Sequence, residues 1–342
     1  MTMEKGRFDN PIEAVLVGVK ELFNRQTNLR PIQDSDRLDG KTTLITGANS
    51  GIGFAVAVEY ARRGAHVIMA CRGGIPQAGD KVRKLSGSDK VEMIRVDLTS
   101  LDSIYSLTDQ LKQRKMKLDV VVDNAGVTPP FARKTVHGLE EMFAVIYLSK
   151  FIFINRLLRD GTIPNEVYAG NALPHGAPRP RILFTSSDSH RNATPIEFER
   201  LGVYEDYNPT RAIKLYGYYK LVLNTYAAEL SRRLNPNGAV DVSVFPLCPG
   251  AVRTNIIRDA PAFLKLVLGG VFYLFFQSPE KATGPFVYLG AGPEVEGSTC
   301  RYLHMMAEKQ MDEKAYDPDA GRRLWERSEE IMDSISYSGS SR

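Results

Sequence analysis

Residues 41–63 read KTTLITGANSGIGFAVAVEYARR, and this stretch decides the fold. Residues 41–46 form a β-rich run, and residues 52–63 have the apolar spacing of an amphipathic helix. Between them, glycines at positions 47, 51 and 53 permit a tight turn, close approach of the backbone to a ligand, and close packing of helix on strand. A helix N-terminus favours anionic groups, so the pattern predicts a dinucleotide site; a glycine-rich turn without a ligand is the alternative.

The following segments alternate between strand and helix patterns. Strands are predicted at residues 67–70, 91–96, 120–122, 182–184 and 240–245, and helices at residues 52–63, 101–115, 139–158 and 215–234. Parallel strands need crossover connections, which are usually helices, so the order predicts an α/β fold with a Rossmann-type doubly wound parallel sheet. Ligands of such sheets bind beyond the carboxyl ends of the strands.

We expect a single domain with two appendages. Residues 1–35 are predicted to form an N-terminal helical extension, with an amphipathic helix at residues 11–25, and a polar connector. Residues 36–310 are predicted to form the Rossmann domain, and residues 311–342 a C-terminal helix with a frayed tail.

The composition is that of a soluble globular protein, with 342 residues of which 43% are hydrophobic and 25% charged. The net charge of +4 comes without a Lys/Arg block, so a nucleic-acid partner is not expected. Three cysteines without CxxC or Cys/His spacing predict neither a disulfide framework nor a metal site, and they favour a reducing compartment.

No segment predicts export or a membrane span. The first residues are polar, unlike a secretory signal, and the most apolar run, residues 266–276, is eleven residues long where a span needs about 20. That run is either a buried core helix or an apolar lid that contacts a substrate or a membrane surface. We therefore expect a cytoplasmic protein, with peripheral membrane contact left open.

The second predicted strand ends in HVIMACRGG, which supplies Arg72 and no Asp or Glu. A carboxylate at this place accepts from the ribose 2′-hydroxyl of NAD, whereas a guanidinium suits the 2′-phosphate of NADP. Arg72 therefore favours NADP(H); a solvated surface arginine is the alternative.

Tyr216 and Lys220 lie one helical turn apart in the predicted helix 215–234. A lysine ammonium beside a phenol lowers the pKa of the phenol from about 10, which allows proton exchange with a carbonyl or alcohol near neutral pH. The YxxxK spacing also occurs by chance, so a surface tyrosine and lysine are the alternative.

With these motifs the chain resembles the short-chain dehydrogenase/reductase family. The motifs occur in the family's order: TGANSGIG at 46–53, Asp97 in VDLTS, Asn124-Ala125-Gly126, Ser187 in FTSSDSH, YGYYK at 216–220, and Pro249-Gly250 before Thr254. The phrases ACR at 70–72, SPEKA at 278–282 and RRLWERSEEIM at 322–332 are similar to the retinol-dehydrogenase-like branch. The resemblance covers residues 36–332.

The resemblance implies a role for each matching residue. Tyr216 is implied as the acid/base group, Ser187 as the holder of the substrate oxygen, and Lys220 as the group that tunes the tyrosine and binds the nicotinamide ribose. Tyr216 and Lys220 also count among the implied cofactor-binding residues, which otherwise are Gly47, Asn49, Ser50, Gly51, Ile52, Gly53, Arg72, Asp97, Leu98, Asn124, Ala125, Gly126, Pro249, Gly250, Val252 and Thr254. A helix N-cap is the alternative for Asp97.

The sequence departs from the family pattern at two positions. Where the family has FxVNHLGHF, residues 143–151 read FAVIYLSKF, so Ile146 takes the place of the asparagine. An aliphatic side chain makes no hydrogen bond and cannot anchor the usual water relay behind the lysine. Asp123 replaces the first asparagine of NNAG.

We expect an NADP(H)-dependent oxidoreductase that interconverts a carbonyl and an alcohol on a small apolar substrate such as a lipid, retinoid, steroid or polyketide. The apolar segment 262–276, where the family closes over its substrate, indicates that class. The alternative is a dinucleotide-binding protein with little turnover that acts as a redox sensor or scaffold. Homo-oligomers are common in the family and are expected here.

Overall fold

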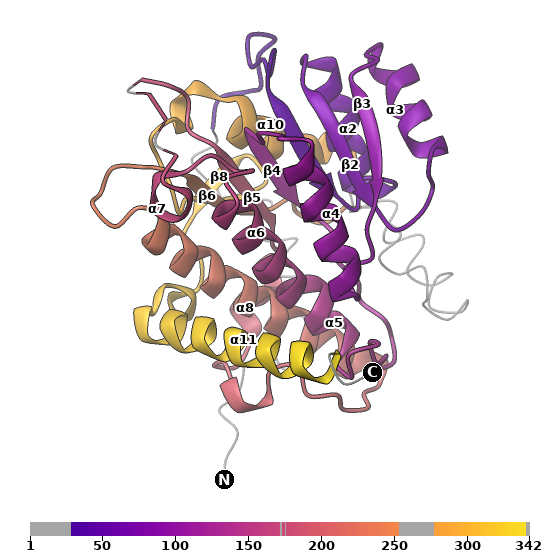
Figure 1. Ribbon diagram of the computed structural model, residues 1–342, viewed down its shortest axis with the longest axis vertical. Helices are drawn as coiled ribbons and strands as arrows, with labels where there is room; N and C mark the ends of the chain where they lie inside the picture. Colours follow the sequence, from indigo (N-terminus) through magenta and orange to yellow (C-terminus); the bar gives the residue numbers. More distant parts are fainter. Residues whose placement is uncertain (1–28, 172, 175, 253–276, 340–342) are drawn as a thin grey trace.

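The computed structural model describes residues 29–339, apart from 172, 175 and 253–276, and in this part of the chain it contains one eight-stranded sheet (Figure 1). The strand order is β3-β2-β1-β4-β5-β6-β7-β8, with β8 antiparallel to β7 and every other pair parallel. The strands are β1 Thr42–Thr46, β2 His66–Cys71, β3 Val91–Arg95, β4 Val120–Asp123, β5 Arg181–Thr185, β6 Ser243–Cys248, β7 Tyr302–His304 and β8 Ala307–Lys309.

Helices cover both faces of the sheet (Figure 1). One core cluster joins the sheet to α4, α6, α8 and α11, and the other joins it to α2, α3 and α10. The helices are α2 Gly51–Arg62, α3 Gln77–Ser86, α4 Leu101–Gln113, α5 Glu141–Phe143, α6 Ser149–Arg159, α7 Glu166–Ala169, α8 Pro209–Leu234, α10 Gly284–Ala291 and α11 Pro318–Gly339. A π-helical turn, η1 Ala144–Leu148, joins α5 to α6, and short 3-10 helices are η2 Asp188–Asn192, η3 Phe198–Arg200, η5 Lys281–Thr283, η6 Pro293–Val295 and η7 Glu313–Tyr316.

Strand β1 shows how the sequence buries both faces of the sheet. Successive side chains of a strand point to opposite faces, and Leu44 and Ile45 accordingly belong to opposite core clusters, each fully buried. The chain runs outward from β1 to β3 and then returns to β4 on the other side of β1. The carboxyl ends of β1 and β4 therefore border the topological switch point, where ligands of such sheets bind.

The strand order confirms the predicted Rossmann-type fold, but β6 and the start of α8 differ from the prediction by three residues or more. Strand β6 begins at Ser243 because Asn235 Oδ1 accepts a hydrogen bond from the backbone N–H of Asp241 at 2.7 Å, which holds residues before the strand in a turn. Helix α8 begins at Pro209, six residues before the predicted start, because Asn208 caps it and proline at the first helical position loses no hydrogen bond.

Other differences concern whole elements. Helices α3 and α10 and strands β7 and β8 lie where the sequence pattern predicts none, and the predicted helix 139–158 is interrupted by η1. The predicted helix 11–25 and the apolar run 266–276 lie outside the described residues. Among the helices that the structure describes, none combines the length and the apolarity needed to cross a membrane.

Candidate active site

Glycines shape the loop between β1 and α2. Gly47 and Gly51 have φ values of +65° and +58°, where residues with a Cβ are strained. A Cβ at Gly53 would lie 2.6 Å from both the Asn124 Nδ2 atom and the Gly47 carbonyl oxygen. The other predicted loop residues surround the N-terminus of α2: Asn49, Ser50 and Ile52. This glycine-lined helix N-terminus fits the pyrophosphate of a dinucleotide.

The turn after β4 packs directly on the glycine loop. The Thr46 hydroxyl, at the end of β1, donates to Asp123 Oδ1 at 2.8 Å and accepts from the backbone N–H groups of Asn124 at 2.9 Å and Ala125 at 3.0 Å. Asn124 Nδ2 donates to the Thr46 carbonyl at 3.1 Å. One threonine therefore joins the ends of the two strands at the switch point, and Gly126 follows in an exposed position.

Asp123 pairs with a residue that the motifs did not mark. Lys150, the second residue of α6, places Nζ 2.6 Å from Asp123 Oδ1 and donates to the Ala125 carbonyl at 3.0 Å. Both side chains are 1% exposed. The signal in the sequence is a lysine inside an otherwise apolar stretch, AVIYLSKFIF at 144–153.

Two predicted residues lie at the ends of β2 and β3. Arg72 follows β2 directly and is exposed, and in the described part of the chain no acidic side chain pairs with it. Asp97 accepts hydrogen bonds from the backbone N–H and hydroxyl of Thr99 at 3.0 and 2.7 Å. Ser100 is the N-cap of α4, so the capping alternative for Asp97 is wrong. Leu98 lies beside Asp97, partly buried.

The three predicted catalytic residues come from β5 and α8. Ser187 lies two residues beyond β5 and caps η2, while Tyr216 and Lys220 lie one turn apart on α8. Tyr216 lies close enough to Ser187 for the serine side chain to act on the pKa of the phenol. Lys220 Nζ donates to the Thr185 carbonyl at 2.7 Å and lies 5.4 Å from the ring centroid of Tyr216.

Burial dominates the pKa values of this pair. It raises the pKa of Tyr216 well above its ordinary value, and the Ser187 side chain only partly opposes it. Burial also lowers the pKa of Lys220 from 10.5 to about 7, with a further lowering from the charge of Lys150. The structure therefore does not bear out the expected lowering of the tyrosine pKa by its lysine: Lys220 approaches the ring face of Tyr216, and burial disfavours the charged form of the lysine.

The neighbouring tyrosines of YGYYK contact other parts of the molecule. The Tyr218 hydroxyl accepts from the backbone N–H of Glu197 at 2.9 Å, and the Tyr219 phenol lies near Glu140, whose charge helps to raise its pKa. Of the three phenols, only that of Tyr216 is near enough to Ser187 for the serine to act on its pKa. The geometry therefore favours Tyr216 as the proton-transferring group.

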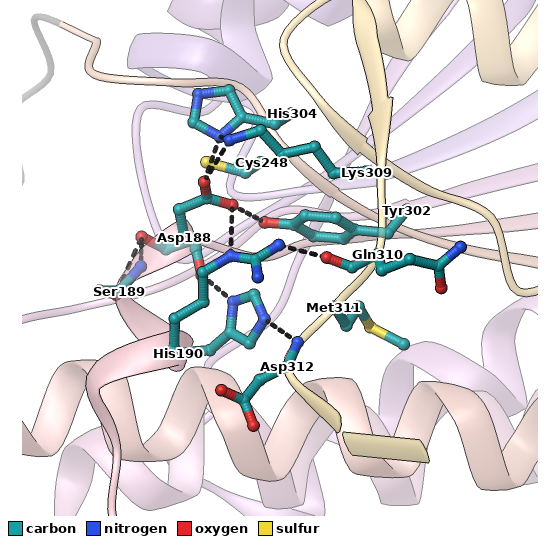
Figure 2. A network of polar contacts seen from close by, with 12 residues as sticks. Asp188, Ser189, His190, Cys248, Tyr302, His304, Lys309, Gln310, Met311 and Asp312 are labelled. Atoms are coloured by element: carbon teal, nitrogen blue, oxygen red, sulfur yellow. Dashed lines mark hydrogen bonds and ion pairs between the residues drawn. The ribbon is translucent and has the colours of Figure 1, made fainter. Parts of the chain in front are cut away.

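An ion-paired network holds the segment that follows Ser187 (Figure 2). The Asp188 carboxylate accepts from the Tyr302 hydroxyl at 2.6 Å and lies 2.5 Å from His304 Nδ1 and 3.1 Å from Lys309 Nζ. Burial opposes ionisation, but the hydrogen bond and charge of His304, with help from Tyr302 and Lys309, hold the pKa of Asp188 well below its usual range. The β7–β8 hairpin thereby fixes the residue next to Ser187.

Cys248, at the end of β6, brings a third metal-ligand type to this network. Asp188, Cys248 and His304 offer ligand atoms within 4.8 Å of one another. However, the Lys309 ammonium lies 3.1 Å from the carboxylate and 3.5 Å from His304 Nδ1. It therefore already supplies the positive charge that a metal ion would bring to this group. Burial raises the pKa of the Cys248 thiol to about 11, which keeps it protonated. We interpret the group as structural.

The remaining predicted cofactor-binding residues lie in the loop after β6. Pro249 is buried, and Gly250 has a φ of +84° with its would-be Cβ 2.8 Å from the Met305 side chain. Val252 is 8% exposed and bridges to Gln277. The last predicted residue, Thr254, lies outside the described residues.

Ile146 occupies the centre of the π-helical turn η1 and is fully buried in the core. It packs in the cluster that includes Phe143, Tyr147 and Tyr219. Apolar packing therefore fills the position where the family has an asparagine.

Comparisons with known proteins agree with this site. A family profile described as short chain dehydrogenase matches residues 41–162. Human retinol dehydrogenase 14 is 34% identical over 90% of this chain and 91% of its own length. Human polyprenol dehydrogenase is 31% identical over 85% of this chain and 84% of its own. The chain belongs to the short-chain dehydrogenase/reductase family of oxidoreductases, and within that family it is most readily compared with the retinol-dehydrogenase-like branch.

Solved structures show the same fold. A short-chain type dehydrogenase/reductase from Mycobacterium marinum, 22% identical, superposes with a TM-score of 0.58 and covers 83% of this chain and 98% of its own. An NADPH-dependent 3-quinuclidinone reductase from Rhodotorula rubra is 20% identical. It superposes with a TM-score of 0.58 and covers 86% of this chain and 98% of its own.

Proposed function

We propose that the protein is an NADP(H)-dependent oxidoreductase that interconverts a carbonyl and an alcohol on a predominantly apolar substrate. The observation that carries the proposal is the placement of Ser187, Tyr216 and Lys220 beyond the carboxyl end of β5, next to the switch point lined by the glycine loop. A hydroxyl, a phenol and an amine at one sheet edge can bind an oxygen atom and move a proton to it.

The residues around the switch point fit a nicotinamide dinucleotide. The N-terminus of α2 would hold the pyrophosphate, and Arg72 would bind a 2′-phosphate, since its guanidinium is exposed and no acidic side chain of the described residues competes for it. Asp97, Leu98 and Asn124 would contact the adenosine, and Val252 the carboxamide. When bound, the nicotinamide exchanges a hydride with the substrate carbon.

The chain's own residues would handle the proton. The Tyr216 hydroxyl gives its proton to the carbonyl oxygen in reduction and takes it back in oxidation, while Ser187 donates a hydrogen bond to the same oxygen. Lys220, when charged, favours the phenolate. The network of Asp188 keeps Ser187 in place while this happens.

Two further lines support an apolar substrate. Two of the relatives are named for retinol and polyprenol, alcohols that are largely hydrocarbon. The segment 262–276, which follows the loop after β6, reads AFLKLVLGGVFYLFF. We also propose a cytoplasmic, homo-oligomeric enzyme; the three free thiols, Cys71, Cys248 and Cys300, suit a reducing compartment.

Fluorescence titration with NADPH and NADH, followed by turnover assays with a panel of apolar aldehydes and ketones, tests the proposal. We expect roughly tenfold to hundredfold tighter binding of NADPH, because a charge-assisted contact is worth about 1.5–3 kcal/mol. Arg72→Glu should abolish the preference, and Arg62→Glu, at the far end of α2, should keep it. Equal affinity of the wild type for both cofactors would refute the NADP assignment, and tight binding without turnover would favour the binding-protein alternative.

A further inference from the structure

The buried ion pair between Lys150 and Asp123 lies directly behind the candidate cofactor site. An ion pair that is 1% exposed on both sides is unusual, since removing two charges from water costs free energy that their attraction need not repay. A buried pair is therefore weak evidence for stability and a reason to ask what else it positions.

The contacts of the pair lead to both halves of the site. Asp123 accepts a hydrogen bond from the Thr46 hydroxyl, which in turn accepts from the backbone N–H groups of Asn124 and Ala125. Asn124 Nδ2 would lie 2.6 Å from a Cβ at Gly53, so any shift of this turn reaches the glycine loop. Lys150 holds the same turn a second time, through the Ala125 carbonyl at 3.0 Å.

The pair also acts, through its charges, on Lys220 in the candidate catalytic half of the site. The groups whose charges act on the Lys220 ammonium are Lys150, which disfavours it, and Asp123 and Cys248, which favour it. Lys150 is thus a second ammonium close enough to affect the catalytic lysine, and Asp123 partly offsets its effect.

We infer that Lys150 is a positioning residue of this enzyme: paired with Asp123, it fixes the turn 123–126 against the glycine loop, and the two charges of the pair act together on Lys220. The inference rests on the proposed function only in taking a nicotinamide dinucleotide as the ligand. It also gives the departure at Asp123 a structural partner, because Lys150 pairs with the carboxylate that stands where the family has an asparagine.

The test compares Lys150→Met with Arg156→Met, which removes the Asp109 ion pair from the outer side of the same helix. Both variants are checked for folding by circular dichroism, and NADPH affinity and the pH profile of kcat are then measured. We expect Lys150→Met to weaken NADPH binding at least about tenfold, because the Ala125 carbonyl loses its donor and the buried Asp123 carboxylate keeps only the Thr46 hydroxyl. Its pH profile should shift to higher pH, since the pKa of Lys220 rises when a like charge is removed. Arg156→Met should change neither.

If Lys150→Met does not fold, Lys150→Gln, which keeps N–H donors without the charge, should still shift the pH profile. A folded Lys150 variant with wild-type NADPH affinity and an unshifted pH profile overturns the inference. Failure of the wild type itself to bind either NADPH or NADH would instead refute the proposed function, so the two failures are distinguishable.

Discussion

The stability of the cofactor-free protein should rise between pH 7 and pH 8, and Lys220 should cause most of the rise. Lys220 is buried on α8, and its amine donates a hydrogen bond to the Thr185 carbonyl at 2.7 Å. Burial, aided by the charge of Lys150, lowers its pKa from 10.5 to about 7 in the folded state. Above pH 7 the folded protein has therefore released a proton that the unfolded chain still binds.

The sign and size follow from proton linkage. Where the unfolded state binds more protons, the free energy of unfolding rises with pH, by at most about 1.4 kcal/mol per pH unit for one group. Because a lysine with a folded pKa of about 7 is still half protonated at pH 7, the rise from pH 7 to pH 8 is about 1 kcal/mol. The gain continues toward pH 10.5, but the thiols of the unfolded chain begin to ionise above pH 8 and oppose it.

Urea unfolding at pH 7.0, 7.5 and 8.0 measures the effect, with the sole tryptophan, Trp325, as a buried fluorescent probe. Lys220→Met should remove about 1 kcal/mol of the rise, and Lys214→Met, at an exposed position of the same helix, should remove none. Groups such as His190 titrate equally in the wild type and in both variants. The difference in the pH-dependent rise between wild type and Lys220→Met therefore isolates the contribution of Lys220. An equal rise in wild type and Lys220→Met would refute the assignment.

Three further outcomes are expected. Tyr216→Phe should lower turnover by about 10² to 10⁴ with unchanged NADPH affinity, and a variant that keeps its rate would contradict the role of the phenol. Gly53→Ala should lower both stability and NADPH affinity, because its Cβ would lie 2.6 Å from Asn124, whereas Gly126→Ala, with open space around its Cβ, should not lower stability; an equal Tm for the two variants would argue against a close-packed loop. Ile146→Asn should cost about 1–3 kcal/mol of stability, because an amide replaces a fully buried aliphatic chain, while turnover at neutral pH is at least preserved; a loss of turnover in the folded variant would place Ile146 in the substrate wall.

The glycine loop and the parallel sheet were predictable because their signals are local. Residues 46–53 specify a turn within eight positions, and an apolar strand such as Thr42–Thr46 needs only the knowledge that both of its faces are buried. The start of α8 was also readable in principle, since Asn208-Pro209 is a capping signal that precedes the apolar pattern. Strands β7 and β8, of three residues each, are too short for a periodic pattern to mark them.

The electrostatics of the site could not be predicted from motif spacing. The YxxxK spacing places an amine near a phenol, and the sequence interpretation takes the amine to be charged. Whether it is charged depends on burial and on distant charges: Lys220 contacts Thr185, 35 positions away, and the charge of Lys150 on α6 acts on it. Desolvation of a lysine outweighs its stabilising contact with a phenol when no carboxylate pairs with it directly.

The departures from the family pattern at Asp123 and Ile146 also could not be interpreted from the sequence alone. Taken separately in the sequence, each removes a polar group that the family uses, and together they predict a weakened proton relay. In the fold, β4 and α6 bring Asp123 within 2.6 Å of Lys150, a residue 27 positions away, so the first departure gains a partner that no local pattern shows. Ile146, one turn before Lys150 on the same run of helix, then packs in the core and excludes water from the cluster around Tyr147. In the proposed mechanism, the proton that restores Tyr216 would therefore reach Lys220 by a route that does not pass position 146, because the residue there is aliphatic and fully buried.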